Sequence, residues 1–404
     1  MNYTVRERFD EINGQINRVG SDAVNYVFCA DIHADEYLRK NSNGELKVFE
    51  DAAAVENRIE KTISHLKAAV NFAENNDNID FLAIGGDIIN SYSIKGKQAV
   101  IDTINRTLSP LRNCTKPVII AFGNHDDNGF QILNPDVPEI RLEWLISDKD
   151  WKEKVLGNYP FAKNCVHDKS YEFSKYFYYD LNRKKTRVIV LDTMDMRKPF
   201  DENGTVTENV NRLPRFWYTN EQLDWLCGQA LCAPEDWDYI IISHMGIEND
   251  TSCNCKNGEN LRKIFKAFKE RGAISFDYTD LNGGKICVNR DFGNIKSGKI
   301  LLYNFGHQHA ELVHYSKDID LWQVATGCEN AWGGCGEPGE DKNLPWVLMT
   351  DRTEGTERET CIDVFSVNRS IAYKFNVCPG KDAIMTVYGC CFLSIRLSVQ
   401  KLRC

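Results

Sequence analysis

Five short apolar runs in this chain each end at a residue whose side chain can bind a metal ion. Short runs rich in β-branched residues are typical of buried strands that are covered on both faces. The runs and the polar residues that follow them are 24–30 before Asp31 and His33, 81–86 before Asp87, 118–123 before Asn124, His125 and Asp126, 239–243 before His244, and 300–306 before His307 and His309. Ligands bind beyond the carboxyl ends of such strands in open α/β sheets. The pattern therefore predicts both a scaffold and a site.

Other segments show the periodicity of helices and hairpins. Apolar residues from Val55 to Val70 recur on one face of a helix over 52–73, and a second helix is predicted over 97–108. Further helices are expected over 219–231, with Thr219 as N-cap and Gln222 as its capping-box partner, and over 261–269. The remaining predicted strands are 171–180, 186–191, 285–288, 312–315, 321–324, 360–367 and 371–377. The mixture predicts an α/β fold.

The composition along the chain suggests one main domain with attached segments. Residues 1–20 form a polar lead-in, and 21–326 form the domain itself. A loop rich in glycine and charge follows over 327–358, and a β-hairpin within 359–388 is expected to complete the same domain. The last segment, 389–404, fits no pattern and is left unassigned.

Charge and hydropathy narrow the range of partners. The net charge is −9, whereas a broad nucleic-acid-binding surface would be basic. A small phosphorylated substrate is still compatible with this charge, because bound cations can invert the local field. The N-terminal segment has no apolar core of the kind a secretory signal needs, and no stretch approaches the roughly 18 apolar residues that span a bilayer. We therefore expect a cytoplasmic protein with no membrane partner; its oligomeric state is unknown.

The fifteen cysteines are an odd number, which favours free thiols in a reducing cell. Four of them lie in polar loops, at Cys253, Cys255, Cys328 and Cys335. A structural zinc site there is an alternative, although the spacing is not that of a C-x-x-C knuckle.

The polar residues at the strand ends have the chemistry of a metal centre. Imidazole and carboxylate ligands together suit Zn, Fe, Mn or Ni. They are too numerous for one tetrahedral zinc, so two ions about 3.5–4 Å apart, sharing a carboxylate, fit better. The alternative is that each is a satisfied polar group at the end of a strand. Asp192, which also ends an apolar run, is interpreted as a cap or turn residue.

The order of these motifs resembles that of the calcineurin-like metallophosphoesterases. The matching motifs are Asp31-x-His33, Gly86-Asp87, Gly123-Asn124-His125-Asp126, a lone His244 and Gly306-His307-x-His309. The C-terminal hairpin is similar to the ending of bacterial and phage-associated members. The resemblance implies a four-layer α/β/β/α sandwich, in which two mixed sheets pack together and helices cover the outside.

The resemblance also implies a role for each residue. Asp31, His33 and His309 would hold one divalent ion, and Asn124, His244 and His307 a second. Asp87 would bridge both ions, and His125 would protonate the leaving oxygen. Many members have an acidic residue at the position of Asn90, where it orients this histidine; here an amide replaces it, and Asp126 is the other group on which His125 could lean.

The function that follows is hydrolysis of phosphomonoesters or phosphodiesters by a dinuclear site with a bridging hydroxide as nucleophile. A second hypothesis is a catalytically quiet metal-binding scaffold for protein partners, which would have no need of the acid His125. A third is a single-metal hydrolase acting on amides, which the surplus of ligands disfavours.

Overall fold

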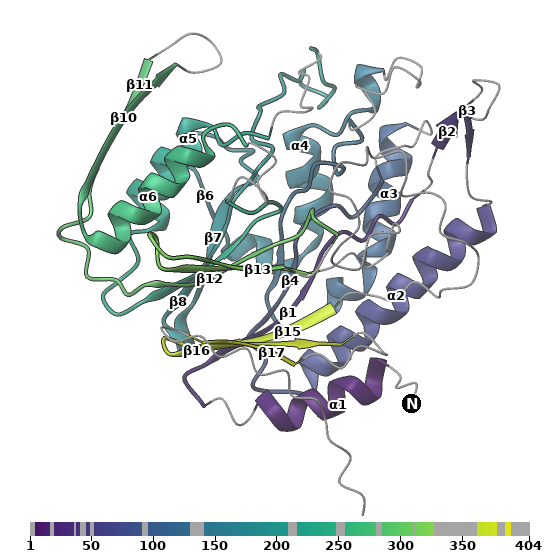
Figure 1. Cartoon of the computed structure of the whole chain (residues 1–404). Coiled ribbons are helices and arrows are strands. Elements are labelled where there is room, and N and C mark those ends of the chain that lie inside the picture. Colours follow the sequence, from purple (N-terminus) through teal and green to yellow (C-terminus); the bar gives the residue numbers. More distant parts are fainter. Residues whose placement is uncertain are drawn as a thin grey trace, which may run out of the picture.

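The computed structural model describes residues 5–16, 20–35, 38–40, 46–48, 52–90, 96–129, 141–208, 216–247, 255–279, 285–309, 312–326, 362–377 and 384–388. These residues form a mixed α/β fold with two large mixed sheets, as the sequence predicts (Figure 1). The predictions for the loop 327–358, for the tail 389–404 and for Cys253, Cys328 and Cys335 lie outside the described residues.

The first sheet has six strands, in the order β17-β16-β15-β1-β4-β5. Three are the predicted parallel strands β1 (Val24–Cys29), β4 (Phe81–Ile84) and β5 (Val118–Ile120). The other three are antiparallel to their neighbours: β15 (Ile362–Val367), β16 (Ile371–Asn376) and β17 (Ile384–Tyr388). The ring of Tyr26 on β1 stacks between those of Phe81 and Phe365, at centroid distances of 4.5 and 5.2 Å. All six residues of β1 are buried, so both faces of the strand are covered, which explains why the run does not alternate between apolar and exposed polar residues.

The second sheet has seven strands, in the order β13-β14-β12-β9-β8-β7-β6. Its parallel centre is β8 (Thr186–Val190), β9 (Asp238–Ile242), β12 (Ile300–Phe305) and β14 (Leu321–Ala325). The antiparallel strands at its edges are β6 (Val166–His167), β7 (Phe177–Leu181) and β13 (Leu312–Ser316). The predicted hairpin is the pair β7 and β8. The two sheets touch where the Tyr26 hydroxyl donates to Oδ1 of Asn304 on β12.

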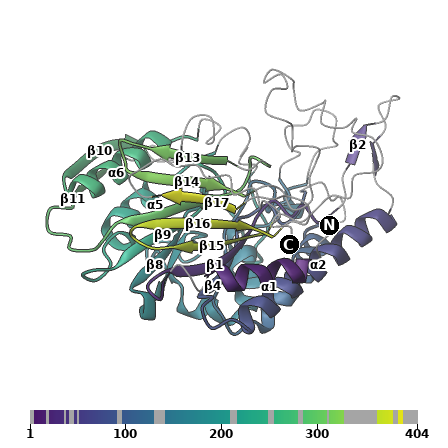
Figure 2. The same ribbon diagram turned by 60° about the horizontal axis from the view of Figure 1, so that its bottom comes forward.

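Helices lie on both flanks of the sheets. Figures 1 and 2 show α1 (Val5–Ile16), α2 (Ala52–Glu74) and α3 (Lys97–Thr107) on one flank, and α5 (Asn220–Trp225) and α6 (Gly258–Glu270) on the other. The short helix α4 (Asp148–Asp150) continues into a π-helical turn, Trp151–Val155. In α2 the predicted apolar face is buried at Val55, Ile59, Ile63 and Leu66. No helix in the described part of the chain combines the length and the apolar character needed to cross a bilayer.

Two small ribbons stand outside the large sheets. One pairs β2 (Leu38–Lys40) with β3 (Leu46–Val48), and the other pairs β10 (Ala273–Thr279) with β11 (Lys285–Asp291). Figure 1 shows the second ribbon projecting beyond α6. The strand predicted over 285–288 is only part of β11, and β10 was not predicted. The signal was present, because Ile274 is buried and Phe276 half-buried while Ser275 and Asp277 between them are exposed.

The capping-box prediction at α5 is half right. The Thr219 side chain accepts from the backbone N–H of Gln222, so Thr219 is the N-cap. The Gln222 side chain, however, does not return to the cap. Its Oε1 accepts from the N–H of Asp192 at 2.8 Å, and its Nε2 donates to the Asp192 carbonyl at 2.8 Å. Gln222 is thus used to hold the loop after β8, where Asp192 makes the predicted turn by accepting from the N–H of Met194.

Candidate metal centre

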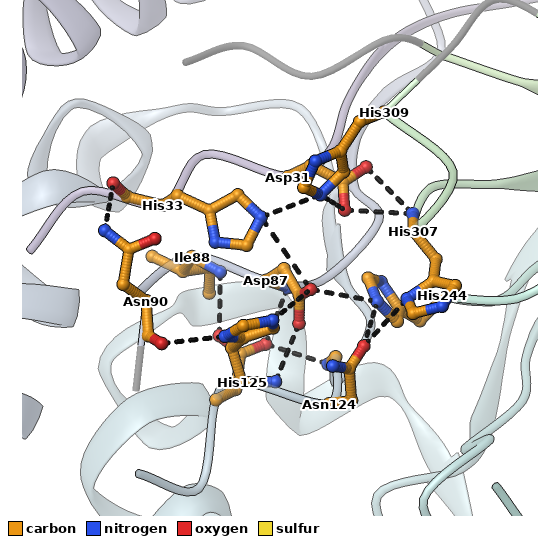
Figure 3. A network of polar contacts seen from close by, with 12 residues as sticks. Asp31, His33, Asp87, Ile88, Asn90, Asn124, His125, His244, His307 and His309 are labelled. Carbon is orange, nitrogen blue, oxygen red and sulfur yellow. Dashed lines mark hydrogen bonds and ion pairs between the residues drawn. The ribbon is translucent and has the colours of Figure 1, made fainter. Parts of the chain in front are cut away.

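The loops that follow β1, β4, β9 and β12 meet at one edge of the two sheets. Parallel pairing continues past the ends of the strands, because Asp31 donates its N–H to the Gly86 carbonyl and His33 donates to the Asp87 carbonyl, both at 3.0 Å. In the second sheet, Gly306 donates to the His244 carbonyl at 3.1 Å. Backbone hydrogen bonds therefore fix how the polar side chains of different loops lie relative to one another (Figure 3).

Four of the residues form a first group, Asp31, His33, Asp87 and His309, whose potential ligand atoms all lie within 4.8 Å of one another. The Nε2 atoms of His33 and His309 are 3.0 Å apart. Nε2 of His309 lies 3.6 Å from Oδ1 of Asp31. All but His309 are buried, and the side chain of His309 is 19% exposed. Donors that converge in this way can hold a divalent cation.

A second group contains Asp87, His244 and His307, again with potential ligand atoms within 4.8 Å of one another. Asn124 joins them through Oδ1, which lies 2.8 Å from Nε2 of His244 and 2.9 Å from Nδ1 of His307. This amide oxygen adds a fourth donor that can bind a metal ion. The structure thus brings all seven predicted ligands into two adjoining groups.

Asp87 belongs to both groups. Its Oδ2 lies 3.1 Å from Nε2 of His244 and 3.9 Å from Nε2 of His33, which come from different sheets. Its Oδ1 accepts from the backbone N–H of His125 at 2.8 Å. The carboxylate is fully buried. A buried carboxylate shared by two sets of potential ligands is the arrangement that a bridging ligand needs.

The backbone at the site is in an uncommon conformation. Positive φ angles occur at five of the candidate ligands: Asp31 (54°), His33 (49°), Asp87 (54°), His307 (66°) and His309 (50°). The left-handed region is unfavourable for residues with a Cβ, and glycine would be the default there. Aspartate and histidine adopt this region more readily than most residues with a Cβ, and five such residues close together fit the tendency of backbone outliers to cluster at functional sites.

Glycines beside the ligands leave room for the carboxylates. A Cβ on Gly123 would lie 2.2 Å from Oδ1 of Asp87, and one on Gly306 would lie 2.6 Å from Oδ2 of Asp31. Carbon and oxygen atoms do not approach that closely without a bond. These two glycines of the motifs are therefore required by the close approach of a ligand.

The pKa shifts of the four histidines in the two groups go in both directions. At His309 burial lowers the pKa, but the neighbouring Asp31 more than compensates, so that the pKa is raised. Burial lowers the pKa of His33 well below its usual value, and the neighbouring His125 and His309 lower it further. Burial likewise lowers the pKa of His307 well below its usual value, with His244 adding to the shift. Burial also lowers the pKa of His244, but Asp87 more than compensates, so that this pKa is raised to about 9. A metal ion at Asp87 would displace that proton, since ligand imidazoles bind in the neutral form.

His125 lies beside the first group. Its ring meets that of His33 edge-on, at a centroid distance of 4.8 Å, and its Nε2 is 3.7 Å from Oδ2 of Asp87. Its other nitrogen, Nδ1, is 2.7 Å from the backbone carbonyl of Asn90. Because a carbonyl can only accept, Nδ1 carries the proton that is donated there. Nε2 is then the atom on the side of the metal groups.

The suggestion that His125 leans on the side chain of Asp126 or Asn90 does not match these contacts. Both oxygens of Asp126 accept from backbone N–H groups, those of Gly123, Asp87 and Ile88, at 2.7–3.0 Å. Asp126 therefore holds the β4 and β5 loops together. The side-chain amide of Asn90 donates to the carbonyl of His33 at 3.1 Å (Figure 3). It also donates to the carbonyl of Asp35, at 2.8 Å. Asn90 serves His125 through its backbone carbonyl instead.

Asp35, two residues after His33, is a further buried carboxylate at the site and is not among the predicted residues. Its Oδ1 accepts from the backbone N–H of Asn90. A signal existed in the alternation of Asp31, His33 and Asp35, which continues the polar motif by one step. Sequence patterns do not show, however, that the last residue faces a neighbouring loop rather than the metal groups.

A model of a known protein family spans most of the fold. The family model described as calcineurin-like phosphoesterase matches residues 24–311. That range includes all seven candidate ligands and His125. No curated protein matches the chain.

Solved structures were compared as well. A conserved uncharacterized protein from Streptococcus pneumoniae, described as a predicted phosphoesterase, is 8% identical with a TM-score of 0.29, covering 90% of this chain and 98% of its own. The NAD nucleotidase of Haemophilus influenzae is 12% identical with a TM-score of 0.33, covering 91% of this chain but 50% of its own. Likeness at these TM-scores shows nothing about the activity of this chain.

Proposed function

Because this chain belongs to the calcineurin-like phosphoesterase family, we propose that it hydrolyses phosphoester bonds with two divalent metal ions. The observation that supports two ions is the position of Asp87, whose carboxylate belongs to both donor groups. Metal-dependent phosphoester hydrolysis is the general chemistry of the family, and its finer features in this chain are the proposal.

The proposed ligands follow the two groups. Asp31, His33 and His309 would hold one ion, Asn124, His244 and His307 the other, and Asp87 both. When bound, two such ions supply an activated water and neutralise charge on the phosphoryl oxygens. Mn, Fe, Zn or Ni suits this mixture of imidazole, carboxylate and amide donors.

His125 is the proposed general acid. The Asn90 carbonyl holds the proton on Nδ1 and turns Nε2 toward the side of Asp87. A second proton on Nε2 can then pass to the leaving oxygen of a substrate bound at the metal groups. The His125 ring is only slightly exposed, with 12% of the side chain accessible, which restricts water around the transferred proton.

The proposed substrate is a small phosphorylated molecule, either a monoester or a diester. A catalytically quiet metal-binding scaffold is the alternative from another class. The oriented His125 ring disfavours it, because binding metals requires no acid beside the ligands.

Turnover with added metal tests the proposal. We expect the purified protein with Mn²⁺ to cleave p-nitrophenyl phosphate or bis-p-nitrophenyl phosphate, EDTA to abolish the reaction, and fresh Mn²⁺ to restore it. Asp87→Asn is the matched control for contaminating phosphatases, since it should be inactive in the same preparation. Absence of turnover with Mn²⁺, Fe²⁺, Zn²⁺ and Ni²⁺ would rule out the enzyme and favour the scaffold.

A further inference from the structure

The loops after β1 and β4 run side by side for several residues beyond their strands. His33 donates its N–H to the Asp87 carbonyl at 3.0 Å, and Ala34 donates to the Ile88 carbonyl at 2.8 Å. These bonds extend the parallel pairing of β1 with β4 up to the metal groups. The two loops therefore behave as one unit that carries Asp31, His33 and Asp87.

Beyond the end of this backbone pairing, hydrogen bonds between side chains and backbone connect the two loops. The carboxylate of Asp35 accepts from the N–H of Asn90, and the side-chain amide of Asn90 donates to the Asp35 carbonyl at 2.8 Å. Each residue thus uses its side chain to satisfy the backbone of the other. Both residues are buried, at 4% and 2% exposure, so neither backbone group can turn to bulk water instead.

The reciprocal pair holds Asn90, the residue whose carbonyl faces His125. This carbonyl accepts the Nδ1 proton of His125 at 2.7 Å, and the N–H of the same residue donates to Asp35. The bond to the N–H orients the peptide that precedes Asn90, and the side-chain amide, bonded to the carbonyls of His33 and Asp35, anchors the residue from a second direction. Rotation of this residue would carry the carbonyl away from the imidazole.

We propose that Asp35 is a positioning residue for His125, which acts through the backbone of Asn90 and not through direct contact. The inference rests on the proposed function in one respect, namely that His125 is the general acid. It explains how the acid is oriented in a chain where the residue at position 90 is an amide. Sequence motifs place an orienting group at position 90 itself, whereas the structure assigns the carboxylate to position 35.

The kinetic test compares two leaving groups. Asp35→Ala should lower kcat for phenyl phosphate, whose leaving oxygen needs a proton, at least about tenfold more than kcat for p-nitrophenyl phosphate. Asp35→Asn keeps an oxygen that can accept from Asn90 and should stay within about threefold of the wild type on both substrates. Arg58→Met is the matched control, because Arg58 donates to the Asp35 carbonyl at 2.5 Å, so the variant alters the surroundings of Asp35 and leaves its carboxylate in place. Its effect should be equal on the two substrates.

Several kinetic outcomes would overturn the inference. Equal losses on both substrates in Asp35→Ala would show a general structural effect, and a loss in Asp35→Asn as large as in Asp35→Ala would show that the accepted hydrogen bond is not what matters. Metal content and the circular dichroism spectrum of each variant identify a protein that has failed to fold, in which case Asp35→Asn and Arg58→Met still decide between these outcomes.

A second measurement is independent of turnover. The Nδ1 proton of His125 should give a protected imidazole signal in the NMR spectrum of the wild type and of Asp35→Asn, assigned by its absence in His125→Ala. It should be lost in Asp35→Ala. A signal that persists in Asp35→Ala would overturn the role of Asp35. If the wild type cleaved no phosphoester, the proposed function would fail, and this signal would still decide whether Asp35 orients His125.

Discussion

The backbone N–H of His307 donates to both carboxylate oxygens of Asp31, each at 2.9 Å, across 276 residues of sequence. Asp31 follows β1 in the first sheet, and His307 follows β12 in the second. The Asp31 carboxylate thus fastens the two sheets together at the same place where it is proposed to bind a metal. Its orientation is set by the fold, so the first donor group is largely formed before an ion binds.

Asp87→Asn should reduce metal occupancy at both sites, because this carboxylate belongs to both donor groups. We expect the metal-to-protein ratio, measured by inductively coupled plasma mass spectrometry after dialysis, to fall from near two to well below one. Asp31→Asn is the control, since Asp31 belongs to one group only, and it should leave one ion. Equal ratios in the two variants would contradict a bridging role for Asp87.

His125→Ala should separate binding from catalysis. Both ions should remain, and kcat for phenyl phosphate should fall about 10²- to 10⁴-fold, the usual contribution of a general acid. The loss on p-nitrophenyl phosphate should be much smaller, because its leaving group departs without a proton. His314→Ala on β13 controls for removal of an imidazole. Departure of the metals from His125→Ala would mean that His125 is a ligand.

Asn90→Asp should lower the stability of the protein and should not make His125 a better general acid. A carboxylate at this position would face the carbonyls of His33 and Asp35, which now accept from the Asn90 amide. The loss of both hydrogen bonds, together with a buried charge, should reduce the free energy of unfolding by about 1–3 kcal/mol. Urea unfolding measures this, with Asn90→Ala as the control that removes the donors without adding charge. A higher kcat for phenyl phosphate in Asn90→Asp would show that the acidic residue can act here directly.

Because φ of His309 is positive, we expect His309→Gly to be more stable than His309→Ala, the reverse of the usual order. Alanine is normally more stable than glycine, but at a φ of 50° glycine should be more stable by about 1 kcal/mol. His309→Gly and His309→Ala lose the same imidazole, so their difference isolates the backbone. Thermal or urea unfolding of the metal-free variants measures it. The usual order, with alanine the more stable, would show that the backbone at this ligand is unstrained.

Asp195 predicts a pH dependence of stability. Burial raises the pKa of Asp195 to about 7, with Asp192 adding to the shift, whereas an unfolded carboxyl titrates near 4. The folded state therefore holds this proton more tightly, and the stability it contributes is lost as the pH rises from about 4 to about 7. Asp195→Asn cannot ionise, so from pH 5 to pH 8 its free energy of unfolding should fall by roughly 2–3 kcal/mol less than that of the wild type. If the free energies of unfolding of the wild type and of Asp195→Asn, measured in urea, changed equally with pH, the assignment of this pH dependence to Asp195 would be wrong.

The strand ends and their polar residues could be predicted because the signal is local. In each motif a metal-binding side chain directly follows an apolar run, and in three of the five a glycine stands between them, as in Gly86-Asp87 and Gly123-Asn124. The resemblance to a family then extended this signal to the two mixed sheets. The periodic face of α2 and the β7–β8 hairpin were equally local.

The hydrogen-bond partners of individual side chains could not be predicted, because they depend on residues that are close in space but distant in sequence. Gln222 had the spacing of a capping box, but a better pair of partners was available at Asp192, from another loop. Likewise, Asn90 supports His125 by its carbonyl because its side chain already has two acceptors in the loop after β1. A side chain with several possible partners is assigned by the fold, and the sequence alone does not rank them.

The pairing of β1 with β15 has a consequence for the order in which the protein can assemble. Val24 pairs with Val367 and Cys29 with Ile362, so one side of the strand that carries Asp31 and His33 is completed by residues more than three hundred positions later. During synthesis, β1 has no partner on that side until the ribosome has made β15, and contacts this distant in sequence form slowly. A nascent chain would hold Asp31 and His33 on an unfinished sheet edge while the residues between β1 and β15 are translated. Tight metal binding at these residues is thus expected only after β15 has been synthesised.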